Sequence, residues 1–124
     1  MDGNDRMTSI NEVMAYCLSL EGAFERRPFG PDTPVMSVKE KTMFCLIAED
    51  TVPLRISLKC EPMEAELLRA AFDAIIPGYH FNKRHWNTLT LDGSIPPDEV
   101  RRQIRNSYLL ALGRKKEVTP LTVT

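Results

Sequence analysis

The chain has 124 residues and carries 16 lysines and arginines against 17 aspartates and glutamates, so its formal net charge is −1. This length predicts a single domain over 1–124, with a core at about 9–113 and a frayed tail at 114–124. The hydrophobic fraction of 43% and charged fraction of 27% are typical of a globular protein and argue against a disordered chain. The longest apolar run, Met43–Ala48, is too short to span a bilayer.

The first predicted element is a helix that begins after Ser9. Ser9 and Glu12 have the spacing of a capping box, in which each side chain accepts a hydrogen bond from the other residue's backbone amide. The apolar residues that follow recur with the helical period and predict one buried stripe: Ile10, Val13, Met14, Cys17 and Leu18. Gly22 is expected to end the helix. The prolines and glycine of 23–34 predict a loop or a short irregular edge segment.

Three strands are predicted next. Residues 35–39 and 42–48 form two of them, joined by a tight turn at 40–41. Residues 53–60 alternate between apolar and polar side chains, which is typical of an antiparallel sheet with one packed face and one wet face. The apolar set is Leu54, Ile56, Leu58 and Cys60, and the polar set is Arg55, Ser57 and Lys59.

A second helix is predicted to begin at Pro62, because proline suits the first helical position and Glu64 complements the positive helix N-terminus. Its expected buried stripe is Leu67, Leu68, Ala71 and Phe72. Pro77-Gly78 then interrupts the chain before two further strands, at 79–82 and 86–91.

The last predicted strand also alternates. One face carries Asn87, Leu89 and Leu91, and the other carries Trp86, Thr88 and Thr90. A third helix is expected to open at Pro96-Pro97 and to end at Gly113. Its buried positions would be Val100, Ile104, Tyr108 and Leu112.

This element order, α-β-β-β-α-β-β-α, predicts an α+β two-layer sandwich: an antiparallel sheet with the helices on one face. The uncovered face would carry Arg55, Ser57, Lys59, Trp86, Thr88 and Thr90. The strand at 42–48 is apolar on both sides, which predicts an additional apolar patch on the uncovered face. Such a patch typically marks a partner or dimer interface. The alternative is that the tail or the 23–34 segment covers it.

The segment Tyr79–Trp86 has the most unusual composition in the chain, with two cations, two histidines, an amide and three aromatic residues. Lys83 and Arg84 can neutralise phosphates, Asn82 can donate to a phosphate or a base edge, and Trp86 or Tyr79 can stack on a base or pack against a sugar. A hairpin of this kind would act as a nucleic-acid-binding wing. The structural alternative is that Trp86 packs on the sheet and the two cations form an ordinary solvated turn.

Positive charge is concentrated in the second part of the chain. Residues 1–79 hold eight basic against thirteen acidic side chains, whereas 80–116 hold eight against three. This asymmetry predicts that the second part faces an anion, of which nucleic acid is the commonest large one. Two observations oppose that prediction. The pI of 6.1 is far below the value of about 9 expected of a nucleic-acid-binding domain, and Asp98 and Glu99 are spaced to pair with Arg101 and Arg102.

Three segments resemble the MmcQ/YjbR family: "PFGPDTPVMSV" at Pro28–Val38, "PLRISLKCEPMEAE" at Pro53–Glu66 and "IPGYHFNKRHWNTLTLDGSIP" at Ile76–Pro96. The resemblance runs over about 9–113. It implies an α-β(3)-α-β(2)-α fold, described as a double wing and similar to type III secretion chaperones and frataxin. It also implies a DNA-binding, regulatory role. The family's signature falls on Gly78, Tyr79, His80, Asn82, Lys83, Arg84, His85, Trp86 and Asn87, and Phe81 stands where another apolar residue is common.

Other chemistries are less well supported by the residues. His80 and His85 are five apart with no flanking ligand cluster, so no metal and no cofactor is expected. Cys60 shares the apolar face of its strand and is predicted to be an inert buried thiol. Nucleophile, phosphate-loop and zinc-protease motifs are absent, so the protein is not expected to be an enzyme. Three cysteines without a CxxC pair and a polar N-terminus predict reduced thiols and a cytoplasmic location.

The leading hypothesis is therefore a small cytoplasmic DNA-binding protein. Its candidate nucleic-acid-binding residues are Tyr79, Asn82, Lys83, Arg84, His85, Trp86, Arg55, Lys59, Arg101 and Arg105. The alternative is a protein-interaction or homodimerising module that uses Phe44, Leu46 and Trp86 on the open sheet face. A third reading, a ligand- or metal-handling domain, would be built around His80, His85 and Tyr79.

Overall fold

The structure is a computed structural model that describes residues 6–78 and 82–113. Strands in these ranges form one antiparallel sheet in the order β1-β2-β3-β4-β6-β5. The strands are β1 (Phe24–Arg26), β2 (Val35–Val38), β3 (Thr42–Ala48), β4 (Arg55–Lys59), β5 (Ile75–Pro77) and β6 (Trp86–Thr90). The helices are α1 (Ile10–Ser19), α2 (Pro62–Ala71) and α3 (Pro97–Ala111).

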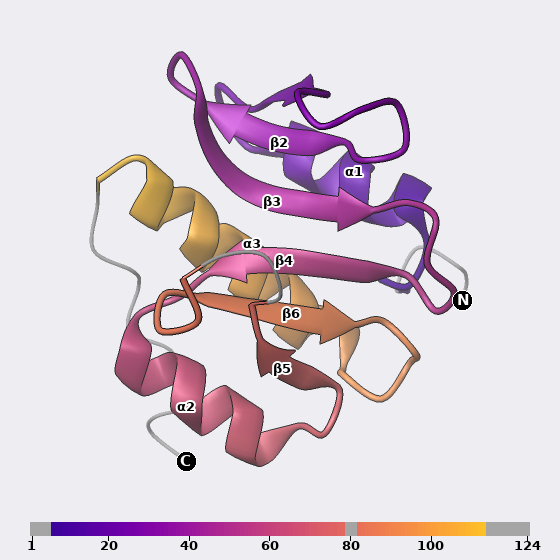
Figure 1. The fold of residues 1–124 in the computed structure, drawn as a ribbon, viewed down its shortest axis with the longest axis vertical. Helices are drawn as coiled ribbons and strands as arrows, with labels where there is room; N and C mark the ends of the chain where they lie inside the picture. Colours follow the sequence, from indigo (N-terminus) through magenta and orange to yellow (C-terminus); the bar gives the residue numbers. More distant parts are fainter. Residues whose placement is uncertain (1–5, 79–81, 114–124) are drawn as a thin grey trace.

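The helices form a second layer, which confirms the predicted α+β sandwich. Figure 1 looks onto the sheet, with α1 and α3 behind it and α2 beside β5. Helix α3 packs on β3 and β4, α1 packs against β2 and α3, and α2 packs against β5 and β6. The sheet has one more strand than predicted, because β1 forms within the 23–34 segment and pairs with β2 at the sheet edge. No described helix packs on the other face of the sheet, which we call the open face. No helix in the described ranges is long and apolar enough to cross a membrane.

Helix α1 begins as predicted. The Ser9 hydroxyl accepts a hydrogen bond from the Glu12 amide at 3.2 Å, and the Glu12 carboxylate accepts from the Ser9 and Thr8 amides at 3.1 Å. Val13 and Cys17 are buried, but Leu18, predicted to lie in the stripe, is 44% exposed. The buried stripe is narrower than expected because α1 flanks α3 and is not enclosed by neighbouring elements.

Strand β3 contains an irregularity that changes which side chains face the helices. Ser37 pairs with Met43 and Met36 pairs with Cys45, so Phe44 is an extra residue without a partner in β2. A bulge of this kind interrupts the alternation of faces. Phe44 is fully buried and contacts the Tyr108 ring of α3 edge to face, with ring centroids 5.5 Å apart. Its predicted position on the open face is therefore wrong.

Strand β4 follows its predicted alternation. Ile56 and Leu58 lie in the core, and Arg55 is exposed. Ser57 faces the open side, where its hydroxyl is 2.9 Å from the Thr88 hydroxyl of β6. Cys60, which follows the strand, is only half-buried, although it packs against the core as its phase indicated.

The predicted stripe of α2 is confirmed at Leu68 and Phe72, which pack in or against the core, but is wrong at Leu67 and Ala71. Leu67 is 59% exposed and Ala71 is exposed, whereas Glu64, Ala65 and Leu68 are buried. The helix lies at the edge of the sheet and buries a narrow face of which Leu68 is the main apolar member. Glu64 is turned inward because a cation of α3 meets it there, as shown below.

The structure has a strand, β5, before the segment 79–82 in which one was predicted. Strand β5 ends at Pro77, Asn82 belongs to the turn that precedes β6, and residues 79–81 lie outside the described residues. The apolar pair Ile75-Ile76 supplies the strand, with Ile75 in the core. The prediction missed it because Pro77 looked like a boundary. A proline is tolerated at the end of an edge strand such as β5.

Candidate nucleic-acid interface

The turn before β6 is held by its own backbone and by Asn82. The Asn82 side-chain oxygen accepts a hydrogen bond from the Arg84 amide at 2.9 Å, and its backbone oxygen accepts from the His85 amide at 3.0 Å. An asparagine that bonds the backbone two residues on is a common means of fixing a turn. The side chains of Lys83, Arg84 and His85 are exposed, and none has an ion-pair partner among the described residues.

Trp86 anchors this turn to the sheet. It is the cross-strand partner of Lys59, whose ammonium lies 5.8 Å from the centre of the indole ring, a cation–π arrangement. Gly78 lies against it: the Gly78 amide donates to the Trp86 carbonyl, and a Cβ at Gly78 would lie only 2.5 Å from the Trp86 Cβ. Trp86 is 8% exposed. Its face is therefore not open for a base, and the structural alternative describes this residue better than the stacking prediction.

A lysine that the sequence did not identify as a candidate, Lys39, lies at the same end of the sheet. Lys39, in the turn between β2 and β3, has a left-handed backbone with φ of +56° and reaches the C-terminal end of α3 beside Gly113. Burial lowers the pKa of Lys59, and the nearby charge of Lys39 lowers it further. We call the group Lys39, Lys59, Lys83 and Arg84 the cationic end. The sequence pattern does not identify Lys39 as a site residue, because Lys39 comes near Lys59 only when β2, β3 and β4 pair in the sheet.

A recess lies beside the cationic end, and one carboxylate lines it. The recess, of about 390 Å³, is lined by Lys59, Cys60, Glu61, Pro62, His85, Trp86 and Leu110. The Lys59 ammonium and the His85 imidazole can both donate hydrogen bonds to an anion in this recess. The exposed carboxylate of Glu61, at the start of α2, would repel an anion there. Beyond Gly113 the sequence continues with Arg114-Lys115-Lys116, outside the described residues.

The other candidate cations lie elsewhere. Arg55 is at the opposite end of β4 from Lys59 and borders the open sheet face. Arg101 and Arg105 belong to α3, on the other side of the sheet, and Arg101 is paired with Asp98 at 2.7 Å. The structure therefore brings Asn82, Lys83, Arg84, His85, Trp86 and Lys59 together but not Arg55, Arg101 and Arg105. Tyr79 and His80 lie outside the described residues.

Arg102 has a structural role between α2 and α3. Its guanidinium donates to Glu64 at 2.8 Å and also to Glu99, one turn earlier in α3. Burial alone would lower the pKa of Arg102, but the two carboxylates more than compensate and raise it. The expected pairing of Asp98 and Glu99 with Arg101 and Arg102 is confirmed. Glu64, by contrast, is not an exposed partner of the helix dipole but a buried member of this network.

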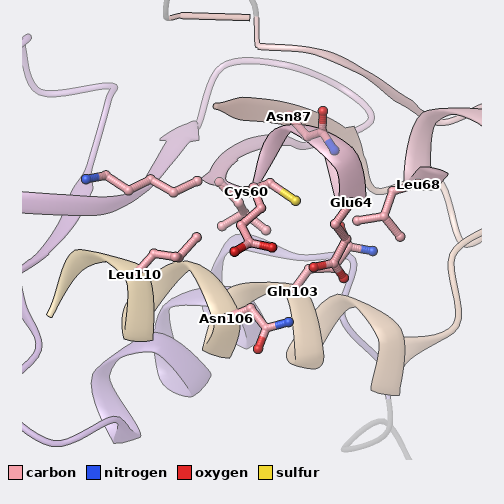
Figure 2. A pocket seen from close by; sticks show the side chains of 10 residues that line it. Cys60, Glu64, Leu68, Asn87, Gln103, Asn106 and Leu110 are labelled. Atoms are coloured by element: carbon pink, nitrogen blue, oxygen red, sulfur yellow. The ribbon is translucent and has the colours of Figure 1, made fainter. Parts of the chain in front are cut away.

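Figure 2 shows a small cavity between α2 and α3, where the polar side chains of Glu64, Asn87, Gln103 and Asn106 lie beside Leu68 and Leu110. Two of its lining atoms, the Asn87 side-chain oxygen and the Asn106 side-chain nitrogen, are buried without a hydrogen-bond partner in the described part of the chain. The cavity volume of about 10 Å³ is at the lower limit for one water molecule. This cavity therefore suits a bound water and is too small for a substrate.

The described histidine and cysteine residues form no metal-binding cluster, and two of the cysteines are buried. Within residues 6–78 and 82–113, no group of three or more histidine, cysteine or acidic side chains is placed to hold a metal ion. Cys17 and Cys45 are buried free thiols, and their hydrogen bond, together with burial, raises the pKa of Cys45. A raised pKa keeps this sulfur protonated and a poor nucleophile.

Comparisons of sequence identify relatives over most of the chain. The family model YjbR matches residues 18–110. The Escherichia coli K12 protein YjbR, described as uncharacterized, is 33% identical over 105 residues, which cover 84% of this chain and 87% of that protein. The Bacillus subtilis protein YyaQ, also described as uncharacterized, is 36% identical over 55 residues, which cover 44% of this chain and 46% of that protein.

Two solved structures are similar in fold and sequence. The crystal structure of the Deinococcus radiodurans protein DR2400, described as containing a DUF419 domain, has a TM-score of 0.83 and 38% identity and covers 93% of this chain and 85% of its own. A Pseudomonas syringae protein has a TM-score of 0.72 and 25% identity, covering 83% of this chain and 98% of its own. On these matches, the chain belongs to the YjbR family.

Proposed function

We propose that this protein is a non-enzymatic DNA-binding protein of the cytoplasm that contacts phosphates through its cationic end. The observation that carries the proposal is the position of Lys83 and Arg84. Both are exposed on a hydrogen-bonded turn, and neither has a carboxylate partner in the described ranges. Lys59 and Lys39 add positive charge behind them. Phosphate oxygens are common partners for lysine and arginine side chains placed in this way.

The same geometry supports backbone contacts more than base recognition. Trp86 is covered, and the Asn82 oxygen accepts a hydrogen bond from the turn, so Trp86 is not placed for stacking and Asn82 retains only its amide nitrogen as the predicted donor. A net charge of −1 provides no long-range attraction to DNA. We therefore expect modest affinity, low sequence selectivity and a log–log salt slope of about −2 to −4, as for two to four phosphate contacts.

Fluorescence anisotropy of a labelled duplex, measured at several salt concentrations, tests this proposal. The variant Lys83→Ala/Arg84→Ala should bind at least about tenfold more weakly than the wild type at low salt, and its salt slope should be smaller in magnitude by about two. Wild-type affinity in this variant would overturn the proposal.

The matched control is Arg55→Ala/Arg105→Ala, which removes the same charge from two exposed positions outside the cationic end. It should retain nearly wild-type affinity, because contacts to phosphates act locally at this net charge. If both double variants lose binding equally, the interaction reflects overall charge and the cationic end is not a site.

A protein partner or a second copy on the open sheet face is the alternative. Phe44 and Trp86, two of the three residues that favoured it, are buried, but Phe29 and Ile76 at the borders of that face are 61% and 40% exposed. Size-exclusion chromatography with light scattering separates the two functions. A stable dimer that Ile76→Glu converts to a monomer, together with no affinity for DNA, would favour the interaction module.

A further inference from the structure

The open face of the sheet contains a hollow that the proposed function does not use. Its floor is formed by Leu46 and Ala48 of β3 with the paired hydroxyls of Ser57 and Thr88. The volume is about 500 Å³, within the range of small-molecule binding sites. The hollow lies on the central strands β3, β4 and β6, which form the middle of the sheet in Figure 1.

Two exposed apolar side chains flank the floor. Phe29, in the segment between β1 and β2, is 61% exposed, and Ile76 of β5 is 40% exposed, and both line the hollow. A large apolar side chain left in water forgoes its burial free energy, which an apolar ligand between them would recover in part. The hollow therefore has an apolar side chain on each of two sides and a floor that is apolar at Leu46 and Ala48 and carries two mutually bonded hydroxyls.

The wall that carries Phe29 is held in place. Arg27 pairs with Glu25 at 2.6 Å and with Glu49 at 3.5 Å, and it also donates to the Pro31 carbonyl. The Glu49 amide donates to the Asp32 carbonyl at 3.2 Å, which ties this segment to the turn after β3. A wall fixed on both sides lowers the entropy cost of binding, so the hollow is largely formed before a ligand enters.

The charges of the lining indicate which kind of molecule would fit. Arg55 borders the hollow, and its guanidinium has no ion-pair partner in the described ranges. Asp50 is the one described carboxylate in the lining, and it is not paired with Arg55. Arg55 gives the lining one point of attachment for a carboxylate, whereas Asp50 opposes further negative charge, so a polyanion such as nucleic acid is disfavoured. A guanidinium fork binds a carboxylate with two parallel hydrogen bonds.

We propose that this hollow binds a small monocarboxylate with an apolar body. The carboxylate accepts hydrogen bonds from Arg55, and the apolar body lies over Leu46 and Ala48 between Phe29 and Ile76. This site is separate from the cationic end, because Arg55 and Lys59 occupy opposite ends of β4. It therefore stands or falls independently of DNA binding.

Decanoate is a suitable probe, added below its micelle concentration to the full, ¹⁵N-labelled chain and followed by NMR. Amide shifts should saturate and should concentrate at Leu46, Ala48, Ser57 and Thr88. Decan-1-ol, which lacks the charge, should bind about tenfold more weakly, and Arg55→Gln should weaken decanoate by a similar factor and abolish the difference between the two probes. Arg84→Gln, an exposed arginine at the cationic end, is the matched control and should leave decanoate binding unchanged.

Ala48→Phe provides a second test, because the larger side chain fills the floor of the hollow. It should abolish decanoate binding and leave duplex binding intact. If this variant does not fold, the comparison of Arg55→Gln with Arg84→Gln still tests whether decanoate binding depends on Arg55. Equal affinity for decanoate and decan-1-ol, shifts spread over the helices, or unchanged binding by Arg55→Gln would each overturn the proposal, as would a stable dimer that covers the hollow.

Discussion

Basic side chains from the same part of the chain reach opposite environments. The Arg102 side chain is 15% exposed and is paired with Glu64, which is 7% exposed, and with Glu99. Lys83 and Arg84, fewer than twenty residues earlier, are exposed and have no ion-pair partner among the described residues. The excess of positive charge after residue 79 is therefore not all surface charge. Part of it neutralises carboxylates between α2 and α3, and only the remainder is available to a ligand.

The two environments also differ in what the charge does for stability. A buried ion pair is costly to desolvate, so forming it contributes little, but removing one partner leaves an uncompensated charge in a poorly hydrated place. An exposed cation in a turn loses little hydration on folding and contributes little to stability. Three measurements test this contrast, from the largest expected effect to the smallest.

Replacing Arg102 should have the largest effect. We expect Arg102→Met to lower the free energy of unfolding by about 3 kcal/mol at neutral pH, because Glu64 would remain buried without its cation. Urea denaturation measures the loss. Adding Glu64→Gln to Arg102→Met should restore part of it, since the second change removes the stranded charge.

Arg84→Met is the matched control for Arg102→Met. It should change the free energy of unfolding by no more than about 0.5 kcal/mol, because the side chain is exposed and unpaired in the described ranges. If the two substitutions lowered the free energy of unfolding by similar amounts, the distinction between the buried, paired Arg102 and the exposed Arg84 would be wrong.

Ser107 tests how the cationic end is attached to the helix layer. Its hydroxyl accepts a hydrogen bond from the Lys59 amide at 2.8 Å and donates to the Phe44 carbonyl, and Ser107 is fully buried. Ser107→Ala should cost about 2 kcal/mol, because both backbone groups lose their partner. Hydrogen exchange should show that the Lys59 amide loses protection. An unchanged Lys59 amide would mean that the strand end is held by other contacts.

Glu12 has the smallest expected loss apart from the Arg84 control, and it limits the generalisation about exposed charge. Burial alone would raise the pKa of Glu12, but hydrogen bonds from the Thr8 and Ser9 amides outweigh it, so its pKa is below the ordinary value of 4.5. Its contribution is therefore complete above about pH 4.5 and is lost as the pH falls through the lower, folded-state pKa. Glu12→Ala should cost about 1 kcal/mol at pH 7 and progressively less below pH 4.5 in urea denaturation. A loss that does not change with pH would exclude the ionised carboxylate as the cause.

The sequence by itself predicted the elements in which local and tertiary preferences agree. The Ser9–Glu12 capping box starts α1 where expected, and the alternation around Ile56 and Leu58 predicts β4 and its faces. Proline and glycine also marked the limits of α3 closely. These features depend on backbone geometry and on the period of apolar residues, and both can be read along the chain.

Tertiary structure decided the features that need a partner from elsewhere. Phe44 faces the helices because β2 and β3 pair with one extra residue, and Glu64 faces inward because Arg102 meets it 38 residues later. Lys39 joins the cationic end, and Arg55 leaves it, only through the order of the strands. Sequence shows which charges and apolar groups a segment carries, but burial and pairing depend on which segments fold against each other. That is why the composition showed the positive charge and only the fold showed which part of it is free to bind.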